Sequence, residues 1–355
     1  MINQVIMFAY NAMTKTRLVL LASFLFVGLC IAGCERAPEY EVAKFSGRTM
    51  GTSYHITLVG QANTPLGVDV NALQDQVDEQ LQYINQLMST YIPDSQLMRF
   101  NDAEAGQWVD LSSPLLEVLA ISQDISEASD GAFDVTVGPL VNLWGFGPQM
   151  QPEVVPSEEE LAAAQALTGY QKLELNGNQA RRSAPIFVDL SAVAKGYGVD
   201  WIVRELVEQG IASFMVEIGG EVRVKGHSPR GSKWRIAVEQ PSMLTGSVAK
   251  AISLSDHAIA TSGDYRNYFE VDGMRYSHTI DPVTGKPINH KLVSVTVVAD
   301  TAARADAWAT ALNVLGPEQG MQLAEAEKLA VYMIVKDGDG FTESQSSHFS
   351  QFTGP

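Results

Sequence analysis

The stretch TSGDYRNYFEVDGMRYSHTIDPVTGKPINHKLVSVTVVADTAARADAWATAL, residues 261–312, concentrates the unusual chemistry of this chain. Its last part predicts a helix, because Thr301 can cap it and the residues that follow are apolar on nearly every side. Such a helix is buried, and Asp306 and Thr310 lie four residues apart on one of its faces. A buried carboxylate is costly without a compensating charge. Two oxygen side chains at this spacing suit a hard cation such as Mg²⁺. The alternative is that Asp306 pairs with a lysine or arginine, or accepts backbone hydrogen bonds.

Helix and strand signals are mixed along the rest of the chain without a regular βαβ repeat, which indicates an α+β fold. Apolar residues at helical spacing predict an amphipathic helix over residues 70–87. A short buried strand, Phe187–Leu190, is expected to lead into a helix that ends near Gly210. We expect Val331–Val335 to be the final strand. No linker divides the sequence after residue 41, so residues 42–355 are expected to form one domain.

The charge of the chain limits its partners. The 355 residues carry a formal net charge of -17, and no run of basic residues interrupts the acidic composition. A surface of this kind repels nucleic acid, which excludes it as a partner. An anionic, phosphate-bearing ligand would need a local cation, and this favours the metal interpretation of Asp306 and Thr310.

The first 33 residues have the pattern of a bacterial export signal. Lys15 and Arg17 precede a short apolar run, Leu18–Ala32, which is too brief for a comfortable membrane span. The sequence Ile31-Ala32-Gly33-Cys34 at the end of this run resembles a lipoprotein lipobox, so we expect Cys34 to be lipidated and residues 34–41 to form a tether. The alternative is a buried apolar helix that ends in an isolated cysteine. Lipidation would place the domain at the periplasmic face of a bacterial membrane.

Several common catalytic signatures are missing. The sequence has no dinucleotide-binding glycine motif that opens a helix, no Walker loop, no H-E-x-x-H zinc motif and no G-x-S-x-G elbow. Gly219-Gly220 lies between two expected strands, where a tight hairpin turn is the commoner explanation. Generic motifs therefore indicate only an exported α+β domain that could bind a metal.

A set of short motifs, in order from about residue 45 to 335, resembles the ApbE family of FAD:protein FMN transferases. Each motif is weak alone, but the ordered set is specific. The motifs are Met50-Gly51-Thr52, Asp94-Ser95 to Asn101, Gly131 to Val135, Val188-Asp189-Leu190-Ser191 to Gly198, Ile218 to Glu221, Thr261 to Tyr268, Ser277 to Pro282, and Ala305 to Trp308.

This resemblance implies the family's fold and a specific reaction. The reaction is Mg²⁺-dependent transfer of the FMN half of FAD to a protein threonine or serine, with release of AMP. The implied acceptors are extracytoplasmic flavoprotein subunits of membrane redox complexes, such as the sodium-pumping quinone reductase and related electron-transport complexes. Two alternatives remain: an FAD pyrophosphatase that yields FMN and AMP, and a periplasmic lipoprotein that binds FAD without catalysis.

The resemblance also implies residue roles. Asp306, Thr310 and the main-chain oxygen of Ala192 are the implied Mg²⁺ ligands, whereas Ala309 stands where some relatives carry a further acid. His278 is the implied general base for the acceptor hydroxyl, since imidazole accepts a proton near neutral pH. The implied FAD contacts are Met50, Tyr91, Ala132, Phe133, Asp134, Asp189, Lys195 and Ile280.

Overall fold

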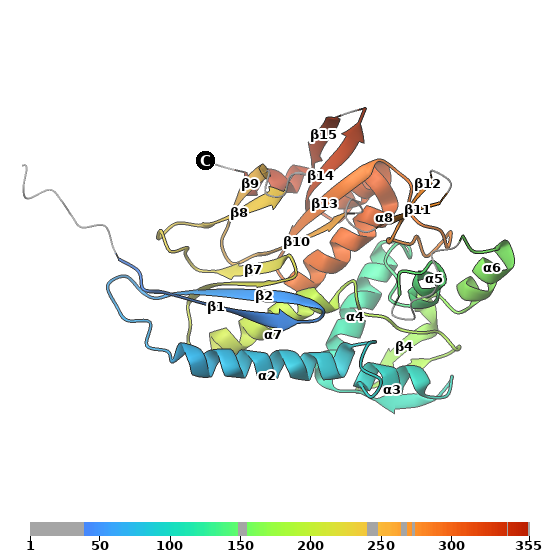
Figure 1. Cartoon of the computed structure of the whole chain (residues 1–355), viewed down its shortest axis with the longest axis horizontal. Helices are drawn as coiled ribbons and strands as arrows, with labels where there is room; N and C mark the ends of the chain where they lie inside the picture. Colours follow the sequence, from blue (N-terminus) through green and yellow to red (C-terminus); the bar gives the residue numbers. More distant parts are fainter. Residues whose placement is uncertain are drawn as a thin grey trace, which may run out of the picture. The chain divides into compact units, whose positions relative to one another are not determined.

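An eight-stranded antiparallel sheet forms the centre of the fold in the computed structural model, which describes residues 39–147, 155–239, 248–263, 268–271, 274–338 and 340–353 (Figure 1). The chain from Tyr40 to Pro355 makes up one compact unit. The expected leader, the tether up to residue 38 with its lipidated Cys34, and the Arg266 region of the Thr261–Tyr268 motif lie outside the described residues.

Every neighbouring pair in the central sheet is antiparallel, and most neighbours in the sheet are consecutive in the chain. This local pairing is what produces an α+β fold rather than a parallel α/β fold. The predicted fold class is confirmed. The strands, in their spatial order, are β1 (Val42–Thr49), β2 (Thr52–Val59), β6 (Ser213–Ile218), β7 (Glu221–Lys225), β10 (Ala258–Gly263), β13 (Leu292–Ala299), β14 (Ala330–Asp337) and β15 (Gly340–Gln345).

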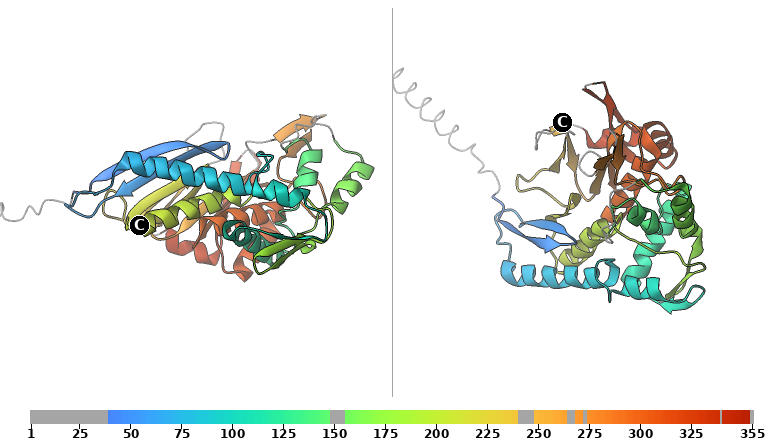
Figure 2. Two further views of the ribbon diagram at one scale, coloured as in Figure 1. Left: turned by 90° about the horizontal axis from the view of Figure 1, so that it is seen from below. Right: turned by 45° about the vertical axis from the view of Figure 1, so that its right-hand side comes forward.

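Three helices cover one face of this sheet: α2 (Val70–Met88), α7 (Ala194–Glu208) and α8 (Ala302–Ala326) (Figure 2). The helix α2 buries the row that begins at Leu73 and continues through Ile84, as its helical spacing predicts. The helix α8 is interrupted at Gly316, whose φ of 76° is outside the helical region. Within the described part of the chain, no helix combines the length and the apolarity that crossing a membrane requires.

The opposite face of the sheet is covered by a hairpin and a short C-terminal 3-10 helix. The hairpin consists of β8 (Trp234–Glu239) and β9 (Val248–Leu254), and the 3-10 helix η2 spans Ser347–Phe352. Phe349 of η2 is fully buried and stacks on Tyr332 of β14 with a ring-centroid separation of 5.5 Å. Because β13 and β14 are buried on both faces over most of their length, their sequences are largely apolar.

A second group of elements packs beside α8, mainly through α4 (Figure 1). This group includes a second β-hairpin, which precedes the segment that carries His278. The helices are α3 (Gln96–Asp102), α4 (Ser113–Ala128), α5 (Gly138–Leu143) and α6 (Glu158–Ala166), with the 3-10 turn η1 (Tyr170–Lys172). The strands are β3 (Trp108–Asp110), β4 (Leu173–Asn176) and β5 (Gln179–Arg182) in one small sheet and β11 (Tyr268–Val271) and β12 (Met274–Ser277) in the hairpin.

Two secondary-structure predictions are wrong in an informative way. Phe187–Leu190 is not a strand, because its backbone groups pair with other partners. The side-chain amide of Asn101 donates to the Val188 carbonyl oxygen and accepts from its N–H, both at 2.8 Å, and Asp189 N–H donates to Val135. An asparagine thus replaces a neighbouring strand. The predicted strand at Val331–Val335 is present as part of β14, but the prediction that it is the final strand is wrong, since β15 follows it.

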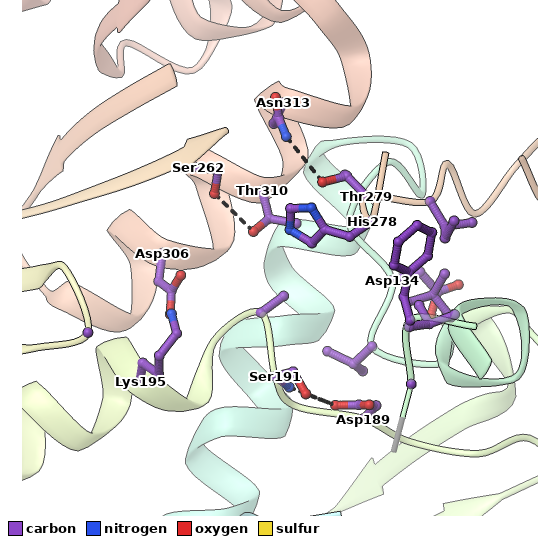
Figure 3. A pocket seen from close by; sticks show the side chains of 18 of the residues that line it. Asp134, Asp189, Ser191, Lys195, Ser262, His278, Thr279, Asp306, Thr310 and Asn313 are labelled. Atoms are coloured by element: carbon purple, nitrogen blue, oxygen red, sulfur yellow. Dashed lines mark hydrogen bonds and ion pairs between the residues drawn. The ribbon is translucent and has the colours of Figure 1, made fainter. Parts of the chain in front are cut away.

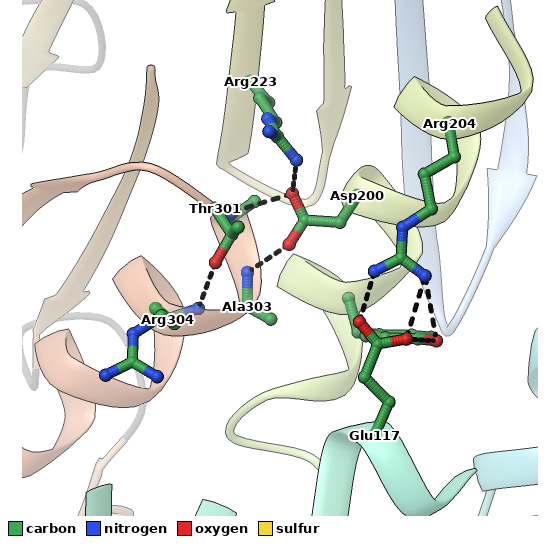
Figure 4. A network of polar contacts seen from close by, with 9 residues as sticks. Glu117, Asp200, Arg204, Arg223, Thr301, Ala303 and Arg304 are labelled. Carbon is green, nitrogen blue, oxygen red and sulfur yellow. Dashed lines mark hydrogen bonds and ion pairs between the residues drawn. The ribbon is translucent and has the colours of Figure 1, made fainter. Parts of the chain in front are cut away.

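The junction between α7 and α8 is closely packed and polar (Figure 4). Asp200 of α7 is 2% exposed and accepts hydrogen bonds from the N–H groups of Ala302 and Ala303 at 2.9 and 2.8 Å. It also pairs with Arg223 of β7 at 2.6 Å. A Cβ on Gly196 would lie 2.3 Å from the Ala302 carbonyl oxygen, so only glycine allows this approach. These contacts fix the first turn of α8.

Candidate active site

A cavity of about 640 Å³ opens beside α8, where the ends of several elements meet (Figure 3). This volume lies in the range of small-molecule sites. Ten of the twelve residues predicted for flavin binding, metal binding and catalysis line it, although they come from opposite ends of the sequence. They are Met50, Tyr91, Asp134, Asp189, Ala192, Lys195, His278, Ile280, Asp306 and Thr310.

The two remaining predicted residues are buried beside the cavity. Ala132 is 4% exposed and Phe133 is 1% exposed, and neither lines the cavity. Phe133 belongs to the apolar core that α4 and α8 share. Their contact with a flavin stays a prediction, whereas the next residue, Asp134, reaches the cavity wall.

Two tight hairpin turns bring backbone to the cavity. Met50 and Gly51 join β1 to β2 with φ values of 48° and 73°, the positive pair that a two-residue type I′ turn needs. A methionine in this region of backbone space is uncommon, and such residues cluster at functional sites. Gly219 and Gly220 join β6 to β7 with φ values of 61° and 107°, which confirms the predicted hairpin turn.

Asp306 lies on the inner wall, on the predicted buried helix α8. It is 4% exposed, and its Oδ2 accepts a hydrogen bond from the Gly196 N–H at 3.1 Å. The Lys195 Nζ lies 3.7 Å from the same oxygen. Thr310, one turn further along α8, shares a hydroxyl–hydroxyl contact of 3.4 Å with Ser262. The pairing that the sequence offered as an alternative to a metal is therefore present, and the cavity reaches Asp306 as well.

A second buried carboxylate, Glu221, lies on the other side of the lysine. Its Oε1 is 2.7 Å from Lys195 Nζ, and the side chain is 5% exposed. Burial raises the pKa of both Glu221 and Asp306 above the usual carboxyl range, and repulsion from Asp306 adds to the rise for Glu221. Burial opposes the charge on Lys195, but the two carboxylates together raise the pKa of this amine. Two acids and one base leave this wall with an excess negative charge when all three are ionised.

Two further aspartates are held in place by local hydrogen bonds. Asp134 accepts from Thr136 N–H at 2.7 Å and from Tyr170 N–H at 2.9 Å, yet burial outweighs these bonds and raises its pKa. Asp189 accepts from the N–H and the hydroxyl of Ser191. In both cases the aspartate carboxylate accepts a hydrogen bond from the N–H two residues further along the chain, and this local turn fixes the direction of the side chain.

His278 approaches the cavity from the segment that follows β12. Its ring makes an edge contact with Phe146, with the ring centroids 6.4 Å apart. The next residue, Thr279, is bonded to Asn313 of α8, whose side-chain Nδ2 donates to the threonine hydroxyl at 3.4 Å. This contact ties the His278 segment to the helix that carries Asp306 (Figure 3).

The sequence alone assigns no role to six polar residues of the cavity, Ser191, Glu221, Thr261, Ser262, Thr279 and Asn313. Asn313 could have been found, because it lies three residues after Thr310 and seven after Asp306, on the same face of a helix. Glu221 directly follows the Gly219–Gly220 pair and begins β7, with no other chemical motif beside it. Only the fold shows that this strand begins beside α7 and the lysine.

The oxygen atoms on this wall are of the chemical kinds that bind a magnesium ion. Asp306, Thr310 and Ala192 offer a carboxylate, a hydroxyl and a main-chain oxygen in one cavity, and Mg²⁺ prefers oxygen ligands and keeps several waters. Among the described residues, no cluster of three or more His, Cys, Asp or Glu side chains is arranged to hold a metal. An ion at this place would therefore depend on water or substrate oxygens for the rest of its coordination.

Known proteins match this chain over nearly its whole length. The model of the ApbE family matches residues 50–333. The FAD:protein FMN transferase of Vibrio cholerae is 49% identical over 336 residues, which cover 94% of this chain and 98% of that protein. The enzyme of the same description from Escherichia coli K12 is 42% identical over 351 residues, with 95% and 97% covered.

Solved structures agree. The flavin transferase ApbE from Vibrio cholerae superimposes with a TM-score of 0.81 at 48% identity, covering 88% of this chain and 99% of that one. The apo form of the Pseudomonas stutzeri flavinyl transferase ApbE gives a TM-score of 0.82 at 42% identity, covering 89% and 98%. The fold and the site thus define the class of flavin transferases with this α+β architecture. The chain belongs to the ApbE family.

Proposed function

We propose that this transferase uses FAD as its flavin donor and moves the FMN half to a threonine or serine hydroxyl of an acceptor protein, with AMP as the leaving group. One observation carries the proposal: a single cavity joins His278 to the oxygen donors of α8, in a chain 49% identical to an FAD:protein FMN transferase. In this proposal His278 would accept the proton of the acceptor hydroxyl, and the oxygen donors of α8 would hold the metal that binds the phosphates.

In the proposed reaction, the acceptor hydroxyl oxygen attacks the phosphorus of the FMN half of FAD. The new phosphoester bond forms as the bond to the AMP oxygen breaks, and AMP leaves with the electron pair. The His278 imidazole takes the hydroxyl proton. Met50 and Tyr91, the latter 70% exposed, both line the cavity and would contact the flavin ring.

Charge at the cavity supports a role for Mg²⁺. Asp134, Asp189, Glu221 and Asp306 line it, whereas Lys195 is the one lysine or arginine among its described lining residues. A pyrophosphate would be repelled by this excess of acids without a further cation. Asp306, Thr310 and the main-chain oxygen of Ala192 would hold Mg²⁺, which would neutralise charge on the phosphate oxygens.

The three possible activities differ in their products. Protein, FAD and Mg²⁺ are incubated with an acceptor domain, and the products are examined by mass spectrometry. Covalent FMN on the acceptor supports the transferase. Free FMN and AMP without modified acceptor would identify a pyrophosphatase instead, and intact bound FAD would identify a carrier.

The role of His278 is tested by His278→Ala. This variant should bind FAD like the wild type but lose most of its transfer rate, about 10²-fold or more, as expected for removal of a general base. His55→Ala is the matched control, since this exposed histidine pairs with Glu217 on β6 and does not line the cavity. Wild-type turnover by His278→Ala would exclude the histidine from the mechanism.

We further propose that the acceptors are extracytoplasmic flavoprotein subunits of the sodium-pumping quinone reductase or related electron-transport complexes. Enzyme and acceptor would then meet at the periplasmic face, with the enzyme anchored through lipidated Cys34. The lipobox-like sequence before Cys34 supports this location. Labelled palmitate should enter the wild-type chain, and its incorporation into Cys34→Ala would refute the anchor.

A further inference from the structure

Glu221 is a buried carboxyl group that the proposed reaction does not use. It is the first residue of β7, directly after the Gly219–Gly220 turn, and it is 4% exposed. Its Oε1 lies 2.7 Å from Lys195 Nζ. Its Oε2 is buried and has no hydrogen-bond partner among the described residues. A buried carboxylate with one unsatisfied oxygen is costly, so a functional reason for the charge is worth seeking.

The position of the lysine supplies that reason. The Lys195 ammonium lies between two carboxylates but is much nearer to Glu221, at 2.7 Å, than to the Asp306 Oδ2, at 3.7 Å. The Asp306 oxygen is bonded instead to the Gly196 N–H at 3.1 Å. Glu221 therefore holds the ammonium just beyond a direct ion pair with Asp306.

This separation matters because an ammonium and a divalent cation compete for the same carboxylate. With Glu221 neutral or out of reach, Asp306 would be the remaining carboxylate partner of Lys195 in this group of three side chains. The ammonium would then close on Asp306. At an effective dielectric constant of about 20, closing the gap to about 2.8 Å strengthens the pair enough to weaken a competing cation about tenfold.

We propose that Glu221 is a positioning residue that holds the Lys195 ammonium away from Asp306, so that Asp306 stays available to a divalent cation. This inference rests on the proposed metal site at Asp306. It differs from two simpler roles for Glu221, as a direct metal ligand or as a nearby negative charge. Both simpler roles would act on the cation without the lysine.

The test measures binding of Mn²⁺, as a probe for Mg²⁺, by electron paramagnetic resonance on the purified full-length protein without FAD. Glu221→Gln removes the charge and keeps the shape. Glu221→Asp keeps the charge, but its side chain is one methylene too short to reach Lys195. Both variants should bind Mn²⁺ about tenfold more weakly than the wild type. In a Lys195→Met background, the same two substitutions should change the affinity less than about twofold, since no ammonium is left to compete.

Two results would overturn the inference while leaving the metal site intact. The first is wild-type affinity in Glu221→Asp, which would show that charge alone suffices. The second is an equal loss in both backgrounds, which would show that Glu221 acts on the cation directly. By contrast, equal Mn²⁺ binding by the wild type and Asp306→Asn would remove the proposed metal site, and the inference with it.

Discussion

Replacing Asp200 by asparagine should destabilise the protein more than any other single charge-neutralising change at the base of α8. The carboxylate is 2% exposed and receives hydrogen bonds from the N–H groups of Ala302 and Ala303 and from Arg223 (Figure 4). Asparagine has one acceptor oxygen and an NH₂ group that would face donors. At least one donor loses its partner, and the guanidinium is left without a counter-charge.

The magnitude follows from burial. Breaking a buried ion pair by removing one partner costs about 3–5 kcal/mol. The Arg223 side chain is 24% exposed and can recover some hydration, so we expect the lower part of that range, about 3 kcal/mol. That is a large share of the 5–15 kcal/mol by which folded proteins are typically stable, taken as an order of magnitude. Because Asp306 lies one turn beyond Ala302, the variant should also bind Mn²⁺ more weakly.

The assay is equilibrium unfolding in urea, followed by tryptophan fluorescence, on Asp200→Asn, Arg223→Met and the double variant. The double variant should cost clearly less than the sum of the single ones, since it removes both charges. Asp124→Asn is the matched control, because Asp124 makes an exposed pair with Arg304 on the same turn of α8, and it should cost less than about 1 kcal/mol. A cost below about 1 kcal/mol for Asp200→Asn would refute the reasoning.

Two other changes test the packing of α7. Gly196→Ala should destabilise the protein by about 3 kcal/mol, the upper end of overpacking costs, because its Cβ would lie 2.3 Å from the Ala302 carbonyl oxygen. The control is Gly198→Ala, where the nearest atom to the new Cβ, at 3.0 Å, is the end of a flexible side chain. This variant should lose far less stability in the same urea unfolding assay. Burial raises the pKa of Glu117, but the ion pair with Arg204 outweighs this effect and keeps the pKa below its usual value. The pair therefore stabilises the fold at pH values above about 4.3, the pKa of glutamate in the unfolded chain. This stabilisation is lost as the pH falls below that value. The cost of Glu117→Gln in urea should therefore be largest at pH 7 and shrink below about pH 4, and a cost that grows toward acid would contradict this assignment.

Much of the fold could be predicted because its signals are local. The row of apolar residues in α2 and the Gly219–Gly220 turn each depend on only a few neighbouring residues. The segment Phe187–Leu190 could not be predicted correctly, since its backbone pairs with the side chain of Asn101, 87 residues earlier. Apolar composition alone does not distinguish such a segment from a strand.

The candidate site divides in the same way. The shared position of Asp306 and Thr310 could be predicted from the sequence, because helical spacing places both residues on one face of α8. That His278 and Lys195 reach the same cavity depends on the long-range order of the sheet, and the ordered family motifs supplied this information. Glu221 is the last residue of the Ile218–Glu221 motif, but its proposed role depends on a distance to Lys195 that no local pattern encodes.

Because residue 309 is an alanine, the carboxyl group that lies beside Asp306 is that of Glu221 on β7. Some relatives are expected to carry an acid at this place on α8, whereas Ala309 here is fully buried in the apolar core. The second carboxylate beside Asp306 thus comes from Glu221, on a different element, and it is already engaged by Lys195. A site with one free carboxylate attracts a cation less strongly than a site with two, so its affinity is more sensitive to any competitor for Asp306. In this chain the spacing between Lys195 and Asp306 should therefore control cation affinity.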